Sequence, residues 1–267
     1  MGSLFFDAEG DADLDLYVAN YGADALFQND GGARFQDVRA EAGIGGERWS
    51  AGVCAGDYDR DGDLDLYVTN FDDESNTLYR NEGGLIFTDV TARWGLDAPT
   101  RMPVGFGTVA CDLDSDGDLD LAVTNGHIID NIELYHDGKT HAQRALLLEN
   151  TGGSFQSVSA WEFGATPRVG RCLLAGDLDS DGDLDLIETA CGGAARIYRN
   201  DSAGGGSAAH TVGAQSSYLG SISARGWYGV GSGRPGRRTD SSRRNSQSRK
   251  GSKEMSGQRT RPAPSMR

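Results

Sequence analysis

The sequence predicts an all-β fold built from repeated units of four short strands. An acidic nonapeptide recurs along the first 200 residues, and its four copies begin at Asp7, Asp57, Asp112 and Asp177, 50, 55 and 65 residues apart. A short strand follows each copy, and a turn containing Asn and Gly recurs later in the first three units. Four short strands at this period are typical of a β-propeller blade. We therefore predict a partial β-propeller of about three to four blades in residues 1–200.

The acidic nonapeptide predicts a cation site. The copy Asp57-Tyr58-Asp59-Arg60-Asp61-Gly62-Asp63-Leu64-Asp65 carries five carboxylates in nine residues. Two carboxylates about 4 Å apart repel each other by about 4 kcal/mol at an effective dielectric constant near 20, so the loop needs a compensating charge. Oxygen ligands at alternating positions, with a glycine at the sharp turn, indicate Ca²⁺. A solvated acidic turn without metal is the alternative, and three closely matching copies make it the less favoured one.

Each loop position has an expected role. Asp57, Asp59, Asp61 and Asp65 are expected to supply side-chain oxygens, and position 63 a backbone carbonyl. Gly62, Gly117 and Gly182 are expected to adopt a left-handed conformation that a Cβ would penalise. The candidate ligands of the second to fourth loops are Asp57, Asp59, Asp61, Asp63 and Asp65; Asp112, Asp114, Asp116, Asp118 and Asp120; and Asp177, Asp179, Asp181, Asp183 and Asp185.

The first loop is a degraded copy. Its candidate ligands are Asp7, Glu9, Asp11, Asp13 and Asp15. Ala12 stands where the other copies have glycine, so this turn is expected to be strained, and whether this loop binds metal stays open. An EF-hand is excluded for the stronger copies, because loop position 12 is Val68, Val123 or Glu188 and the flanks are typical of strands.

The segments around the loops predict the strands of each blade. Alternating apolar residues after the loops predict strands at 14–20, 64–70, 119–125 and 184–190. Asn29, Asn81 and Asn150 each end a further strand before a glycine-containing turn, and Phe35, Phe87 or Phe155 opens the next strand. The segment 51–56 illustrates the strand that leads the chain into a loop.

The third unit is longer than the others. An insertion at about 126–144 carries His127, His136 and His141, and we expect it to form a surface loop that leaves the blade intact. With Glu133 and Asp137, these histidines are the best candidates for a catalytic or zinc site. Their spacing matches no zinc motif, and no Gly-x-Ser-x-Gly nucleophile elbow is present. Surface-loop histidines are therefore the preferred interpretation.

The net charge of −15 hides two parts of opposite sign. Residues 1–200 hold 13 basic and 37 acidic residues, a balance of −24 that suits cation binding and argues against a nucleic-acid partner. Residues 201–267 hold 12 basic and 3 acidic residues, a balance of +9, and are rich in Ser, Gly and Arg. This composition predicts a disordered tail. An RNA-binding tail is a less favoured alternative, and a shifted reading frame after the last intact blade is the hypothesis we favour.

The remaining composition gives few constraints. Cys54, Cys111, Cys172 and Cys191 lack metal-binding spacing and are expected to be small buried side chains in strands, with one disulfide as the alternative. No apolar run reaches 18 residues, so no membrane span is expected. The N-terminus shows no signal peptide and starts inside a repeat unit.

The loops resemble the FG-GAP/VCBS repeats of integrin-α-like propellers. The segments 66–70, 125–127, 142–150 and 170–171 resemble the cartilage acidic protein family more specifically, over about residues 1–200. The resemblance implies an extracellular or periplasmic, calcium-dressed propeller used for binding, commonly seven-bladed and followed in bacterial members by an ASPIC/UnbV domain. This chain has only about four loops, no export signal and no Asn-Arg-x-Gly-x-Gly-Ala pattern in its tail. Three to four blades cannot close a ring, so self-association through the open propeller ends is expected.

The leading functional hypothesis is a non-catalytic, calcium-binding module that binds a protein or glycan partner, and no residue is assigned a catalytic role. The first alternative is a propeller-type lyase or hydrolase that uses the histidine-containing insertion at 127–141. The second alternative is a truncated reading frame without a function of its own.

Overall fold

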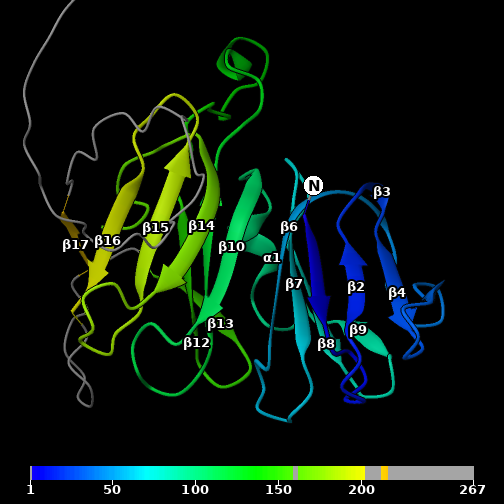
Figure 1. Cartoon of the computed structure of the whole chain (residues 1–267). Coiled ribbons are helices and arrows are strands. Elements are labelled where there is room, and N and C mark those ends of the chain that lie inside the picture. The colour runs from blue at the N-terminus through cyan, green and yellow to red at the C-terminus, as the bar shows by residue number, and fades with distance from the viewer. Residues whose placement is uncertain (1, 159–161, 202–211, 216–267) are drawn as a thin grey trace, which may run out of the picture. The chain divides into compact units, whose positions relative to one another are not determined.

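A computed structural model describes residues 2–158, 162–201 and 212–215, and it confirms the all-β propeller architecture. Four antiparallel sheets follow one another along the chain (Figure 1). The first sheet contains β1 (Ser3–Phe6), β2 (Asp15–Val18), β4 (Ala25–Asn29) and β5 (Phe35–Asp37), and the second contains β3 (Tyr21–Ala23), β6 (Glu47–Gly56), β7 (Asp65–Asn70), β8 (Thr77–Asn81) and β9 (Phe87–Asp89). The third contains β10 (Gly105–Cys111), β11 (Asp120–Asn125), β12 (Leu146–Asn150) and β13 (Phe155–Val158), and the fourth contains β14 (Gly170–Gly176), β15 (Asp185–Ala190), β16 (Arg196–Asn200) and β17 (Val212–Gln215).

Each sheet is one blade, and β3 pairs with the start of β6 as an additional edge strand of the second sheet. Each acidic loop connects β1 to β2, β6 to β7, β10 to β11 or β14 to β15, and the strands of a blade are counted from the one before its loop. The two strands that flank a loop are paired in the same register in different blades. Phe6 lies opposite Asp15 in the first blade, and Gly56 lies opposite Asp65 in the second. The predicted hairpins are also present: Asn81 lies opposite Phe87, and Asn150 lies opposite Phe155. The sequence pattern therefore placed both the loops and the hairpins correctly.

The first strands of successive blades contact one another, so they form the inner layer of the array. Their backbones approach too closely for side chains at one position, five residues before each of the first three loops. A Cβ on Gly52 would lie 2.0 Å from the Phe106 carbonyl oxygen, and one on Gly107 would lie 2.5 Å from the Leu173 nitrogen. Close backbone approach is a recurrent reason for glycine within a strand.

Three apolar cores fill the spaces between neighbouring blades. Tyr17 and Leu26 of the first blade pack with Leu66 and Tyr79 of the second. Each of the other two cores likewise consists of apolar side chains from two successive blades. Both faces of the middle blades are therefore buried, which explains why every residue of β7 and β11 is buried. Tyr67 is buried for the same reason, because its ring enters the core between the second and third blades.

Asparagine side chains add a polar link between blades. The asparagine that ends the third strand of a blade donates its amide Nδ2 to a backbone carbonyl in the acidic loop of the preceding blade. The pairs are Asn81 with Ala8 (2.8 Å), Asn150 with Tyr58 (2.9 Å) and Asn200 with Leu113 (2.8 Å). Each link joins one blade's hairpin to its neighbour's loop, so loop geometry and blade stacking depend on each other.

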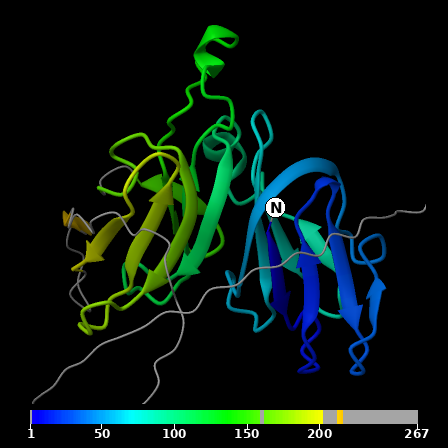
Figure 2. The ribbon, with the colours of Figure 1, turned by 45° about the horizontal axis from the view of Figure 1, so that its top comes forward.

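The insertion in the third unit leaves its blade intact, as expected. β12 pairs with both β11 and β13, and the insertion contains only a 3-10 turn, η1 (Ile132–Leu134). It extends beyond the strand ends opposite the acidic loops (Figures 1 and 2). Lys139 Nζ ties it to the second blade through Asp72 (2.7 Å) and Asp73 (2.8 Å).

Some predictions concern the ends of the chain and the cysteines. β17 pairs with β16 beyond residue 200, where the sequence predicted the propeller to end, and the disordered tail predicted for the remaining segment lies outside the described residues.

All four cysteines are free thiols; Cys111 is buried as expected, whereas Cys172 and Cys191 are exposed, against expectation. Among the described residues no helix is long and apolar enough to cross a membrane. The short helix α1 (Asp97–Thr100) connects the second and third blades.

Replacing Gly52 with alanine tests the inner layer. The added Cβ would overlap the Phe106 carbonyl, so we expect a loss of about 1–3 kcal/mol in the free energy of unfolding, measured by urea denaturation. Gly45→Ala is the matched control, because a Cβ there meets no atom within 4 Å and the backbone angle is ordinary. Equal urea midpoints for the two variants would contradict this view of the inner strands.

Candidate metal centres and binding clefts

Three of the four acidic loops gather their carboxylates around one point. In each, three carboxylate groups offer oxygens that all lie within 4.8 Å of one another. The groups are Asp57, Asp59 and Asp61; Asp112, Asp114 and Asp120; and Asp177, Asp179 and Asp181. These are positions that the sequence predicted to ligate a cation, and the three loops occupy equivalent places in successive blades.

The first aspartate of each of these loops accepts a hydrogen bond from the backbone of the sixth residue, so the loop folds around its carboxylate. Asp57 Oδ2 accepts a hydrogen bond from the Gly62 N–H (3.0 Å), and Asp112 Oδ2 accepts one from Gly117 (2.9 Å). The fourth loop repeats the bond with Asp177. The backbone is therefore already wrapped about the carboxylate cluster.

The predicted left-handed glycines are present. Gly62, Gly117 and Gly182 have φ of 97°, 91° and 99°. Ala12 holds the equivalent place in the first loop with φ of 72°, which confirms the predicted strain there.

The sequence did not reveal a second left-handed position, the fourth of each loop. Arg60, Ser115 and Ser180 have φ between 60° and 63°, whereas the first loop has Gly10 there. Neither arginine nor serine favours this conformation, so the loop imposes it.

The ninth residue of each loop is a buried aspartate that ties three strands together. Asp65 Oδ2 accepts the Tyr58 N–H (3.1 Å), and its Oδ1 accepts the Asn81 N–H (2.8 Å). Asp120 makes the same bonds with Leu113 and Asn150. Desolvation raises the pKa of Asp65 and of Asp120 to about 7, although their backbone donors act in the opposite direction.

Two carboxylate oxygens show that the loops fit a divalent cation. Asp59 Oδ1 and Asp112 Oδ1 are buried and have no hydrogen-bond donor. Buried carboxylate oxygens are normally paired, and an all-oxygen donor set at alternating positions is what Ca²⁺ prefers. Burial is the largest cause that raises the pKa of Asp59 and of Asp114, and the neighbouring carboxylates of Asp61 and Asp116 raise it further.

A residue on the third strand of each blade faces the third position of the loop, and its charge differs among blades. In the second blade Arg80 Nε lies 3.1 Å from Asp59 Oδ2, and in the fourth Arg199 lies 3.4 Å from Asp179. In the third blade Glu149 occupies this place and helps to raise the pKa of Asp114, after the larger effect of burial. The three loops therefore differ in net charge.

The first loop is arranged differently. Gln28 donates its amide to both oxygens of Glu9 (2.9 and 2.8 Å), so the longer side chain is held by the protein itself. Three backbone N–H groups bind Asp7, and the bond from Ala12 is the main cause of its lowered pKa. Among the described residues this loop shows no carboxylate cluster like the other three, and metal binding by Asp7, Glu9, Asp11, Asp13 and Asp15 stays open.

The predicted ligands at the fifth, seventh and ninth loop positions also make contacts of their own. Asp61, Asp116 and Asp181 each accept the N–H two residues later, which fixes the turn. Asp118 forms an ion pair with Arg60 of the preceding loop, consistent with a side chain that is directed away from its own cluster. Asp63 and Asp183 hold the same loop position as Asp118, and Asp185 repeats the buried bonds of Asp65.

The histidines of the insertion do not gather into one site in the described structure. His127 is buried, its Nε2 lies 3.4 Å from Asp72 Oδ2, and its Nδ1 accepts the Ile129 N–H. Glu133 accepts the backbone N–H of His141 (2.8 Å). These contacts fold the insertion and fasten it to the second blade.

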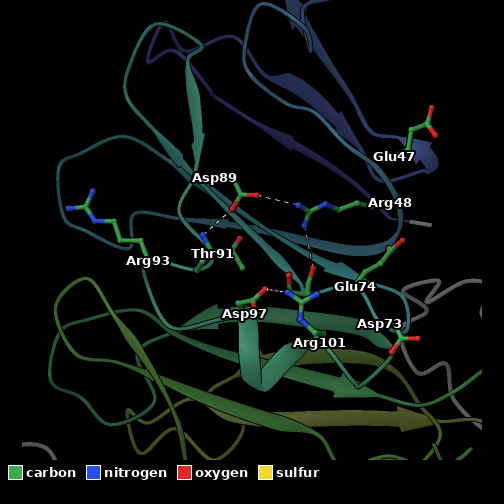
Figure 3. A pocket seen from close by; sticks show the side chains of 11 residues that line it. Glu47, Arg48, Asp73, Glu74, Asp89, Thr91, Arg93, Asp97 and Arg101 are labelled. Atoms are coloured by element: carbon green, nitrogen blue, oxygen red, sulfur yellow. Dashed lines mark hydrogen bonds and ion pairs between the residues drawn. The ribbon is translucent and has the colours of Figure 1, made fainter.

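Of the hollows that the described residues form at the strand ends opposite the acidic loops, two lie between or beside the second and third blades, and sequence reasoning found neither. A cleft of about 720 Å³ is lined by charged side chains of both signs, with ion pairs between Arg48 and Asp89 and between Arg101 and Asp97 (Figure 3). A smaller apolar pocket of about 150 Å³ lies between β6 and β10. It is lined by Trp49 and by Phe71, whose rings stack at 4.3 Å.

Comparisons with known proteins agree with this architecture. A family model described as an FG-GAP-like repeat matches residues 7–68 and 60–123, which include the first three acidic loops. Cartilage acidic protein 1 of Mus musculus and that of Homo sapiens are each 27% identical over 194 residues, and that of Xenopus tropicalis is 25% identical over 196 residues. The alignments cover 68% of this chain but only 27–28% of those proteins, so the chain spans little more than a quarter of their length.

Solved structures are similar as well, and one of them is described as that of an Agrocybe aegerita lectin that recognises non-reducing terminal N-acetylglucosamine. The TM-score is 0.44 at 19% identity, over 75% of this chain and 48% of that chain.

The buried aspartates predict how stability depends on pH in metal-free protein. A pKa of about 7 in the folded state exceeds the ordinary value of 3.8, so Asp65 and Asp120 stabilise the fold at low pH, and this stabilisation is lost as the pH rises through about 7. With chelator present, we expect the free energy of unfolding to be greater at pH 5 than at pH 8, by on the order of 2 kcal/mol.

Urea denaturation at the two pH values measures this difference. Asp120→Asn removes one of the two groups and should flatten the pH dependence, whereas Asp30→Asn, at an exposed hairpin turn, should leave it unchanged. Metal-free protein that becomes more stable from pH 5 to pH 8 would contradict the assignment.

Proposed function

We propose that this chain, whose residues 7–123 match the FG-GAP-like repeat model, is a non-catalytic, calcium-stabilised β-propeller module that binds a protein or glycan partner outside the cell or in the periplasm. The observation that carries the proposal is the carboxylate cluster repeated at equivalent places in three blades, two of which hold a buried oxygen that lacks a hydrogen-bond donor. Weak calcium sites, with Kd of about 10⁻⁴–10⁻³ M, are typical of extracellular modules.

Calcium has a structural role in this proposal. The first, third, fifth and ninth residues of the second to fourth loops would hold the ion, and bound Ca²⁺ would supply the positive charge that the clustered carboxylates lack. Since Asp65 also binds the Asn81 N–H, and Asn81 reaches into the loop of the preceding blade, an ordered loop stabilises the contact between blades.

The partner is proposed to bind near the strand ends opposite the loops. Trp49 and Phe71 present aromatic surface beside the apolar pocket, and the charged cleft offers hydrogen-bonding groups of both signs close by. Aromatic rings with nearby polar groups suit both glycans and peptide side chains. The arrangement of His127 favours a structural role over catalysis, because both of its ring nitrogens already have polar neighbours within the fold.

Thermal unfolding with and without calcium tests the proposal. At about 10 mM Ca²⁺, each site with Kd of 0.1–1 mM adds about 1.4–2.7 kcal/mol, so three sites should raise the melting temperature by at least several degrees over chelated protein. The triple variant Asp57→Asn, Asp112→Asn, Asp177→Asn should lose this response. An unchanged melting temperature of the unmodified chain in calcium and in chelator would refute the proposal.

The residue facing each loop predicts how the sites differ in affinity. Arg80 supplies a positive charge beside Asp59 that competes with the cation, so Arg80→Gln should tighten calcium binding at the second loop. Glu149→Gln should weaken binding at the third loop, where the carboxylate adds negative charge. Both changes should be about threefold to tenfold, which corresponds to about 0.7–1.4 kcal/mol.

Calcium titration calorimetry measures these affinities. Arg34→Gln is the control, since Arg34 is exposed and pairs only with Asp30 at a hairpin turn among its described contacts. Changes of the opposite sign in the Arg80 and Glu149 variants would show that these side chains do not face the bound ion.

A further inference from the structure

The second and third acidic loops are connected through one residue, Asn150. Asp120, the last residue of the third loop, accepts the Asn150 backbone N–H (2.9 Å). The Asn150 side-chain amide donates in turn to the Tyr58 carbonyl oxygen of the second loop (2.9 Å). We propose that calcium binding at these two loops is positively cooperative and that Asn150 transmits the coupling, an inference that rests on the calcium sites of the proposed function.

The Tyr58 carbonyl belongs to the peptide group that precedes Asp59, a proposed ligand. The orientation of this peptide group helps to set the position of Asp59, whose carboxylate forms the cluster of the second loop with those of Asp57 and Asp61. The hydrogen bond from Asn150 therefore restricts the loop backbone in the conformation that gathers its carboxylates. Restricting a loop in its bound conformation before the ligand arrives raises affinity.

The third blade also holds the side chain of Tyr58. The Tyr58 ring is 1% exposed and packs edge-on against Phe155, with ring centroids 5.9 Å apart. Phe155 lies opposite Asn150 in the hairpin of the third blade. Both the backbone and the side chain of this loop residue are thus fixed by one hairpin, and that hairpin is tied to the third loop through Asp120.

The carboxylate cluster of the third loop contains Asp120 itself, together with Asp112 and Asp114. These three groups would be drawn together around a bound ion, so the Asp120 carboxylate would be held in place. The hairpin that donates to Asp120 would then present the Asn150 amide to the second loop from a more restricted position. By linkage, calcium at the second loop raises the affinity of the third loop by the same factor.

A second contact joins the same two loops. Arg60 of the second loop forms an ion pair with Asp118 of the third. The residues at the Arg60 position in the first and third loops are Gly10 and Ser115, which carry no charge. The second and third loops are therefore the pair in which coupling is best measured.

Repulsion between the two bound ions acts in the opposite direction. At about 0.15 M salt, interactions between exposed charges are largely screened beyond about 8 Å. The positive sign of the proposed coupling therefore requires that the hydrogen-bonded connection through Asn150 outweigh the repulsion that remains. Measurement of the binding constants at this salt concentration decides between the two effects.

Calcium titration calorimetry on chains with two working loops tests the proposal. Asp7→Asn and Asp177→Asn together remove the outer sites and leave the second and third loops intact. Adding Asp112→Asn or Asp57→Asn then leaves a single site at the second or the third loop. The product of the two binding constants in the two-site chain, divided by the product of the two single-site constants, is the coupling ratio. It should be about five or more, a typical size for coupling between sites.

Asn150→Ala should bring the coupling ratio close to one. Asn81→Ala is the matched control, because Asn81 makes the same bond from the second blade to the Ala8 carbonyl of the first loop, and it should leave the ratio unchanged. Asn150→Asp keeps the oxygen that accepts the Gly152 N–H and loses the amide donor. This second variant should lower the ratio as Asn150→Ala does, in a chain that keeps the turn acceptor.

Three results would overturn the proposal and leave the calcium sites in place. They are a ratio of one or less in the two-site chain, a ratio that persists in both Asn150 variants, and a ratio that Asn81→Ala lowers as much as Asn150→Ala does. A lack of calcium binding by the unmodified chain would instead overturn the proposed function, and this inference with it.

Discussion

A buried aspartate at the end of each acidic loop holds the corner where three strands of a blade meet. Asp65 receives one N–H from its own loop and another from the third strand, and Asp15, Asp120 and Asp185 repeat the pattern. The neighbouring asparagine then reaches into the loop of the preceding blade. The carboxylate is thus the point through which loop, blade and stack are connected.

This constraint links the charge of the loops to the stability of the fold. Burying an aspartate is costly, as the raised pKa values of Asp65 and Asp120 show, and the surrounding carboxylates increase the cost. A proton or a divalent cation can each relieve it. The proposed calcium sites and the expected pH dependence of metal-free protein therefore have one physical origin.

Much of the architecture could be predicted because the unit repeats. The positions of the loops, the left-handed Gly62 and the hairpin opened by Phe87 followed from local patterns that recur at fixed places. The left-handed Arg60 could not be predicted, since its residue type opposes that conformation and only the closed loop enforces it. Contacts such as that of His127 with Asp72 join residues 55 apart in the sequence and depend on the packed blades.

Two features could have been found by aligning the units more closely. Glycine recurs five residues before the first three loops, and the asparagine that ends the third strand recurs in all four blades. The recurring glycine and the recurring asparagine both make contacts between blades. Their role is therefore not visible when each repeat unit is considered alone. β17 was missed for a different reason, because its segment has the polar, glycine-rich composition that predicts disorder.

The most direct measurement is a crystal structure of the chain grown in excess Ca²⁺, with anomalous scattering data that locate the ions. The account predicts a peak in each of the loops that begin at Asp57, Asp112 and Asp177, about 2.3–2.6 Å from carboxylate oxygens of the cluster. Well-ordered loops without anomalous density, in crystals that hold calcium in the solvent, would contradict it.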